Sequence, residues 1–202
     1  MRNPIAVLLE RLVMQPMWAQ FRTGLESAAV PGSGGVLFLG DSITHIGRWD
    51  LMFPSIATRN FGISGERSGH LLQRLAPIVS IKPHKIFILI GTNDLATKIK
   101  IEEIAANVAQ LVDELVRALP DCKIYLQTVL PRANKFTARV KALNALYVEI
   151  AKQRRIELVD LFPLFDDGTG AIKKEVTNDK LHLMGPGYKI WRDAIAPLVL
   201  SA

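Results

Sequence analysis

The chain has 202 residues, 49% of them hydrophobic and 22% charged, and this predicts one domain with a sizeable core. The composition excludes a disordered or collagen-like chain. Lys and Arg number 25 against 19 Asp and Glu, which gives a net charge of +6 spread along the chain. Such a spread is typical of solvated helix faces and gives no support for nucleic-acid binding.

The N-terminal segment carries no recognisable motif. Its apolar residues predict a helix over residues 5–23 that Pro16 ends or kinks. Charged residues interrupt the apolar stretch, which argues against a signal peptide, and no apolar run reaches the roughly 18 residues of a membrane span. We therefore expect a cytoplasmic protein without stable membrane insertion. It should form one domain over residues 1–202, with residues 1–33 packed on it as a helical extension.

Beyond the glycine-rich turn at residues 31–35, apolar runs alternate with helical patterns. The predicted strands are Val36–Leu39, Arg59–Ile63, Ile86–Ile90, Lys123–Leu130 and Ile156–Val159. Apolar residues at helical spacing predict helices at Leu71–Leu75, Ile101–Leu119, Val140–Ile150 and from Pro186 to Leu198. This alternation predicts an open parallel sheet covered by helices on both faces.

Polar and glycine residues follow the ends of these strands, where open α/β sheets bind their ligands. Ser42 follows the first strand, Gly65 the second and Asn93 the third. Asp179 and His182 come after the fifth strand and a polar loop. Each segment alone is common in turns and helix caps, but their order predicts that all five residues meet at one rim of the sheet.

These residue types suit acyl transfer. A serine hydroxyl needs a base to become a good nucleophile, and histidine titrates near neutrality. A carboxylate three residues before the histidine would orient its ring. The backbone N–H groups of Ser42 and Gly65 and the Asn93 amide are candidate donors to an oxyanion, and removing one such donor typically costs about 10²–10³ in rate.

The same segments resemble the four signature blocks of the SGNH (GDSL) hydrolase superfamily, which is named for its Ser, Gly, Asn and His. The resemblance runs from about Val36 to Leu198. NFGISGERSGHLLQRL (60–75), IKPHKIFILIGTND (81–94) and DKLHLMGPGYKIW (179–191) are most similar to the branch around platelet-activating-factor acetylhydrolase catalytic subunits. That branch often has GTNN where this chain has GTND, which leaves the asparagine in place. The resemblance implies a flavodoxin-like three-layer α/β/α sandwich with a central five-stranded parallel sheet.

The resemblance also implies a role for each site residue. Ser42 is the implied nucleophile, and His182 is the implied general base, oriented by Asp179. The N–H groups of Ser42 and Gly65 and the side chain of Asn93 form the implied oxyanion hole. A small-molecule ester is the implied substrate, with no cofactor and no metal. Relatives often form homodimers, so a homodimer is an implied partner, although the sequence does not fix the oligomeric state.

The leading functional hypothesis is a serine esterase acting through an acyl-enzyme on short acyl, especially acetyl, groups. The alternatives are a thioesterase or lysophospholipase for longer chains and a non-catalytic relative that binds acylated ligands. A nucleotide- or flavin-binding module is disfavoured, because GVLFLGDS (35–42) has Asp41 where a phosphate-binding loop needs lysine. His45, His70 and His84 lack metal-ligand spacing and are expected to be surface or structural residues.

Four other residues and one loop lie near the predicted rim. For Asp41 we expect a structural hydrogen-bonding role. We expect Arg132 to be solvated, with contact to an anionic substrate group as the alternative. Tyr188 and Trp191 are expected to pack in the core. The polar loop over residues 166–177 is expected to border the site.

Overall fold

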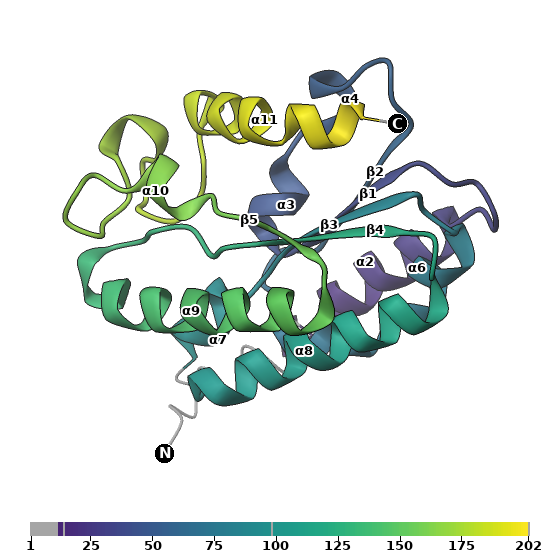
Figure 1. Cartoon of the computed structure of the whole chain (residues 1–202), viewed down its shortest axis with the longest axis horizontal. Helices are drawn as coiled ribbons and strands as arrows, with labels where there is room; N and C mark the ends of the chain where they lie inside the picture. The colour runs from purple at the N-terminus through teal and green to yellow at the C-terminus, as the bar shows by residue number, and fades with distance from the viewer. Residues whose placement is uncertain (1–11, 14, 98, 202) are drawn as a thin grey trace.

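The computed structural model describes residues 12–13, 15–97 and 99–201 of the chain, and a five-stranded sheet lies at its centre (Figure 1). The strands are β1 (Val36–Gly40), β2 (Thr58–Gly62), β3 (Lys85–Leu89), β4 (Lys123–Gln127) and β5 (Glu157–Val159). They follow the order β2-β1-β3-β4-β5, and every pairing is parallel. This confirms the predicted α/β fold.

Helices cover both faces of the sheet (Figure 1). The lower layer in that view contains α2 (Gln15–Ala28), α5 (Ser68–Leu72), α6 (Leu75–Ile81), α7 (Thr92–Ala96), α8 (Ile101–Ala118) and α9 (Thr137–Arg154). The upper layer contains α3 (Ser42–Ile46), α4 (Trp49–Met52), α10 (Phe162–Phe165) and α11 (Gly185–Leu200). Two short 3-10 helices, η2 (Asn134–Phe136) and η3 (Lys174–Val176), lie in the connections.

The central strands β1 and β3 are buried on both faces, and the sheet separates two cores. On β1, Leu37 and Leu39 pack with residues of α5, α6, α8 and α9, whereas Val36 and Phe38 pack with residues of α3, α4, α10 and α11. Successive side chains of a strand point to opposite faces, so an uninterrupted apolar run serves both cores. Phe38 stacks on Trp49 with ring centroids 3.9 Å apart, which fixes α4 against the upper face.

The fourth strand ends earlier than its apolar run predicted, at Gln127 rather than at Leu130. The backbone of Val129 pairs with the Asn144 side chain instead of with a strand: its N–H donates to Asn144 Oδ1 at 2.8 Å, and its carbonyl accepts from Nδ2 at 2.9 Å. A side-chain amide thus satisfies the buried backbone in place of the sheet.

Pro16 also lies at a different place in its helix from the one predicted. The expected helix over residues 5–23 falls partly outside the described residues, and Pro16 is the second residue of α2 rather than its end. Proline is tolerated in the first helical turn because its missing N–H has no intrahelical partner there. Over the described ranges, no helix is both long and apolar enough to cross a membrane.

Candidate active site

Ser42 lies directly beyond the carboxyl end of β1. The strand ends at Gly40, where a Cβ would lie 2.2 Å from the Leu89 carbonyl oxygen, so the close approach of β3 requires glycine. Asp41 caps α3, and its Oδ1 accepts a hydrogen bond from the N–H of Ile43 at 3.0 Å. Ser42 is the first residue of α3, so the helix leaves its backbone N–H without an intrahelical acceptor.

His182 and Asp179 approach Ser42 from the segment between η3 and α11. Ser42 Oγ lies 2.9 Å from His182 Nε2, and His182 Nδ1 lies 2.6 Å from Asp179 Oδ2. Ser42 is only 7% exposed, whereas the side chains of His182 and Asp179 are 34% and 46% exposed. The fold therefore connects a hydroxyl, an imidazole and a carboxylate in series, with the serine and the histidine 140 positions apart in the chain.

The Asp179 carboxylate is held by its own segment. Its Oδ1 accepts hydrogen bonds from the backbone N–H groups of Leu181 at 2.9 Å and His182 at 2.8 Å. Partial burial acts to raise the pKa of Asp179, but the hydrogen bonds from the His182 ring and from these two N–H groups outweigh it and lower the pKa to about 2. An ionised Asp179 selects the His182 tautomer with a proton on Nδ1, which leaves a lone pair on Nε2 facing Ser42.

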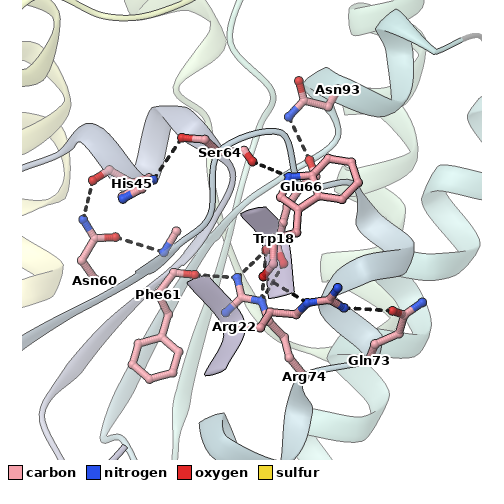
Figure 2. A network of polar contacts seen from close by, with 11 residues as sticks. Trp18, Arg22, His45, Asn60, Phe61, Ser64, Glu66, Gln73, Arg74 and Asn93 are labelled. Carbon is pink, nitrogen blue, oxygen red and sulfur yellow. Dashed lines mark hydrogen bonds and ion pairs between the residues drawn. The ribbon is translucent and has the colours of Figure 1, made fainter. Parts of the chain in front are cut away.

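Gly65 occupies the third position of a tight turn that follows β2. Glu66 N–H donates to the Ile63 carbonyl at 3.1 Å, and the φ of Gly65 is +81°, a value that favours glycine. Asn93 Nδ2 donates to the Glu66 carbonyl at 2.9 Å, so the turn and the start of α7 are joined (Figure 2). The amide nitrogen carries two hydrogens, and the second remains available to a ligand.

Asn93 is itself fixed by its neighbours on α7. Gly91 precedes this helix with a φ of +117°, and a Cβ there would lie 2.8 Å from the Tyr147 hydroxyl oxygen. The buried Asp94 carboxylate accepts hydrogen bonds from the Ser68 backbone N–H at 3.1 Å and from its hydroxyl at 2.7 Å. These contacts tie α7 to α5 and hold the asparagine at the rim.

The sheet order brings the serine, glycine and asparagine to one rim, as predicted. β1 lies between β2 and β3, and Gly40 is in register with Gly62 and Leu89. The Ile63 N–H also donates to the Gly40 carbonyl at 3.0 Å, which continues the β1–β2 pairing into the turn. Chains that leave adjacent parallel strands must emerge side by side, so the segments that carry Ser42, Gly65 and Asn93 lie next to one another at this rim. This arrangement suits acyl transfer.

Asp41 is buried beneath the serine. Its burial raises its pKa to about 7, and the nearby Asp94 and Glu66 carboxylates act in the same direction, while the hydrogen bond from Ile43 opposes them. The side chain caps α3 and places a carboxyl group where a phosphate-binding loop has a lysine. Its hydrogen-bonding role is the structural one predicted.

Arg132 is not simply solvated, which corrects our expectation. It is half-buried, its Nη1 donates to the Thr92 carbonyl at 2.6 Å, and its guanidinium lies 4.1 Å from the centre of the Phe136 ring. Tyr188 and Trp191 pack in the upper core as predicted. The Tyr188 hydroxyl donates to the Ile43 carbonyl at 2.7 Å, which adds a support for α3.

The loop over residues 166–177 lies beside the site. With Arg132, Lys180 and neighbouring residues it lines a cavity of about 240 Å³ next to Asp179. The Thr177 hydroxyl donates to Asp179 Oδ1 at 3.3 Å, so the loop also contacts the carboxylate itself. Within the described ranges, no group of three or more His, Cys, Asp or Glu is placed to hold a metal ion.

Three residues around the Gly65 turn were not identified from the sequence. Glu66 and Arg74 form an ion pair that is 1% and 2% exposed, with Arg74 Nη2 2.5 Å from Glu66 Oε2. Trp18 of α2 donates from Nε1 to the Ser64 carbonyl at 2.7 Å (Figure 2). Charged residues in a sequence indicate surface, and a tryptophan on an amphipathic helix indicates core, so no signal in the sequence marks these contacts.

Known proteins resemble this chain in sequence and in structure. The model of the GDSL-like lipase/acylhydrolase family matches residues 38–190. Subunit alpha2 of platelet-activating factor acetylhydrolase IB from Homo sapiens is 32% identical over 163 residues, which are 76% of this chain and 70% of that protein. The corresponding alpha1 subunit from Rattus norvegicus is 26% identical over 76% of this chain and 69% of its own length.

The structural similarity extends over nearly the whole chain. A Streptococcus pneumonia protein described as a candidate platelet activating factor matches with a TM-score of 0.87 and 27% identity over 98% of this chain and 99% of its own. A GDSL-like lipase from Bacteroides thetaiotaomicron matches with a TM-score of 0.78 and 25% identity over 88% and 95%. Both the sequence and the architecture are therefore similar to those of one group of hydrolases.

Proposed function

The chain belongs to the GDSL-like lipase/acylhydrolase family, an esterase family, and from this premise we propose that it hydrolyses carboxylic esters of short acyl groups through an acyl-enzyme on Ser42. The observation that carries the proposal is the series of contacts from Ser42 Oγ through His182 to Asp179, at 2.9 Å and 2.6 Å. Both distances lie within hydrogen-bond range, so the hydroxyl can pass its proton to the imidazole without a rearrangement.

In the first half of the proposed reaction, Ser42 Oγ attacks the ester carbonyl and His182 Nε2 takes the hydroxyl proton. The carbonyl oxygen becomes an oxyanion, which the N–H groups of Ser42 and Gly65 and the free amide hydrogen of Asn93 stabilise. Asp179 stabilises the imidazolium through Nδ1. As the tetrahedral intermediate collapses, the bond to the leaving alcohol breaks and His182 returns its proton to the alcohol oxygen.

The second half releases the acid. A water molecule gives one proton to His182 Nε2 while its oxygen attacks the acyl carbon, and the same donors hold the new oxyanion. Collapse breaks the bond to Ser42 Oγ, which recovers its proton from His182. The free acid leaves, and the serine, histidine and carboxylate return to their starting protonation states.

The names of the two curated relatives support a short acyl group, because platelet-activating factor acetylhydrolase IB subunits are acetylhydrolases by name. The cavity of about 240 Å³ beside Asp179 supports a polar alcohol portion, because Arg132, Lys174 and Lys180 line it. The alternative is a longer acyl chain, as in a thioesterase or lysophospholipase. A homodimer stays a prediction that light scattering of the purified chain tests.

The test is hydrolysis of p-nitrophenyl esters from acetate to palmitate by the wild type and by Ser42→Ala. We expect the highest kcat/KM at acetate or butyrate and a loss of about 10³-fold or more in the variant. Ser80→Ala is the matched control, because Ser80 lies on α6 and donates to the Pro77 carbonyl, away from the rim. Undiminished hydrolysis by Ser42→Ala would exclude the mechanism. A maximum at long chains would favour the alternative.

A further inference from the structure

Helix α2 makes a specific polar contact with the Gly65 turn. The Trp18 side chain is 5% exposed and lies beside the His70 ring, with centroids 4.9 Å apart. Its indole N–H, which is a donor only, points at the Ser64 carbonyl oxygen, 2.7 Å away (Figure 2). A residue of the N-terminal helix thus reaches a backbone carbonyl 46 positions further along the chain.

That carbonyl belongs to the same peptide unit as the Gly65 N–H. A trans peptide unit is planar and rigid, and its C=O and N–H bonds point in opposite directions. A hydrogen bond that fixes the direction of the Ser64 carbonyl therefore fixes the direction of the Gly65 N–H on the other side. It also polarises the unit, which strengthens the N–H as a donor.

This peptide unit is the central one of a tight turn. Residues Ile63 to Glu66 form a β-turn whose third residue, Gly65, has a φ of +81°, the value of a type II turn. Types I and II differ chiefly by a half-rotation of the central peptide, and a glycine at the third position tolerates both. In the type I orientation the Ser64 carbonyl would point where the Gly65 N–H points now and would repel an oxyanion.

Other contacts hold the rest of the turn. The Ser64 hydroxyl lies 3.0 Å from His45 Nδ1, Asn93 holds the Glu66 carbonyl, and Arg74 holds the Glu66 carboxylate. These contacts hold the side chains of Ser64 and Glu66 and the Glu66 carbonyl. None of them holds the Ser64–Gly65 peptide itself, which can still rotate between the two residues. Trp18 supplies the contact that acts on that peptide directly.

We propose that Trp18 is a positioning residue for the oxyanion hole, which holds the Ser64–Gly65 peptide with its N–H directed at the reacting carbonyl. The proposal rests on the proposed function, because it requires Gly65 N–H to act as an oxyanion donor. Loss of the contact lets the turn populate both orientations of the Ser64–Gly65 peptide, but the Gly65 N–H itself is still present. We therefore expect an effect of about 5- to 50-fold, smaller than the roughly 10²–10³-fold cost of removing a donor outright.

The test compares Trp18→Phe, which keeps an aromatic ring and removes the N–H, with Arg22→Gln. Arg22 lies one turn further along α2, where its Nη1 donates to Gln73 Oε1 at 3.3 Å and its Nε donates to the Trp18 backbone carbonyl at 3.4 Å. This control therefore weakens the docking of the helix, and even the backbone hold on Trp18, but keeps the indole N–H that donates to the Ser64 carbonyl. Replacing Trp18 by 3-benzothienylalanine is the second variant, because sulfur takes the place of the N–H in a ring of nearly the same shape.

Two experiments are carried out well below the melting temperature of each variant. One measures kcat and KM for p-nitrophenyl acetate, and the other measures the inhibition constant of an aryl trifluoromethyl ketone, which forms an oxyanion when a serine adds to it. For both Trp18 variants we expect kcat to fall 5- to 50-fold with KM nearly unchanged. The inhibition constant should rise by a similar factor, and Arg22→Gln should keep wild-type values for kcat, KM and the inhibition constant.

The opposite results would overturn the assignment. Wild-type kcat and inhibitor affinity in the benzothienylalanine variant would show that the N–H contact has no influence on the hole. Equal losses in the Trp18 variants and in Arg22→Gln would show that Trp18 only stabilises the docking of α2. These outcomes are separate from a failure of the proposed function, in which wild-type hydrolysis would be independent of Ser42.

Discussion

The buried ion pair between Glu66 and Arg74 allows a quantitative test of how the Gly65 turn is supported. Arg74 Nε lies 3.0 Å from each Glu66 carboxylate oxygen, and its Nη2 also donates to the Phe61 carbonyl at 2.6 Å. Both side chains are at most 2% exposed. Removing one partner of such a pair leaves an uncompensated charge in the interior, which costs about 3–5 kcal/mol.

The two single substitutions should differ in their pH dependence. Glu66→Leu leaves a buried guanidinium that cannot lose its proton, so we expect the full cost at every pH. Arg74→Leu leaves a carboxyl whose pKa burial already raises above its ordinary value of 4.5. Without Arg74 that pKa rises further, and protonation relieves the penalty. The destabilisation of Arg74→Leu should therefore be small near pH 4 and grow as the pH rises to 8.

Urea unfolding followed by circular dichroism measures both effects. With an m-value of about 3 kcal/mol/M, a cost of 3–5 kcal/mol moves the midpoint down by about 1–2 M. The double variant Glu66→Leu/Arg74→Leu should recover most of the loss, less about 1 kcal/mol for the Phe61 carbonyl that loses its partner. Single variants that each cost under about 1 kcal/mol, or a double variant as unstable as the two losses added together, would refute this account of the pair.

Three further substitutions test the site. Asn93→Ala should lower kcat about 10²–10³-fold in the ester assay, since it removes an oxyanion donor and the contact with the Glu66 carbonyl; a loss below threefold would contradict that role. Asp179→Asn should cost about 10²–10⁴-fold in kcat because it no longer selects the Nδ1–H tautomer of His182, and an unchanged rate would argue against it. Asp41→Asn should stabilise the fold at pH 8 by up to about 4 kcal/mol and have little effect near pH 4. A buried carboxyl whose pKa rises from 3.8 to about 7 destabilises the folded state increasingly as the pH rises between those values. Equal urea midpoint shifts at both pH values would show that ionisation of buried Asp41 does not destabilise the fold.

The strands and the rim were predictable because each depends on a local pattern. A run such as Ile86–Ile90 is apolar and mostly β-branched, as expected of a short strand that is buried on both faces. Residues that follow parallel strands must emerge at one rim, which brought Ser42, Gly65 and Asn93 together without any knowledge of distances. The short helices α3 and α7 were not predicted, because five residues give too few periods for a helical pattern.

The supports of the rim were not predictable, because they join residues that are distant in the chain and chemically ambiguous. Asn144 ends β4 through its side-chain amide, 15 positions after the backbone that it binds. Arg132 was expected in solvent, yet the turn after β4 places its guanidinium between the Thr92 carbonyl and the Phe136 ring. Asparagine and arginine are both common at the surface, so the residue type alone does not predict a buried position. Only the packing of a neighbouring element places these two side chains in the interior.

Three carboxyl groups lie buried beneath the rim. Their placement explains why polar side chains, rather than apolar ones, hold the segments that form the rim. Asp41, Glu66 and Asp94 are each at most 1% exposed, and burial raises the pKa of each one. Asp41 binds the N–H of Ile43, Asp94 binds that of Ser68, and Glu66 binds Arg74. Apolar residues would stabilise the fold more but could not fix the direction of backbone donors. The destabilising groups are thus concentrated where the proposed mechanism needs hydrogen-bond donors that are oriented before the substrate arrives, as in a preorganised oxyanion hole.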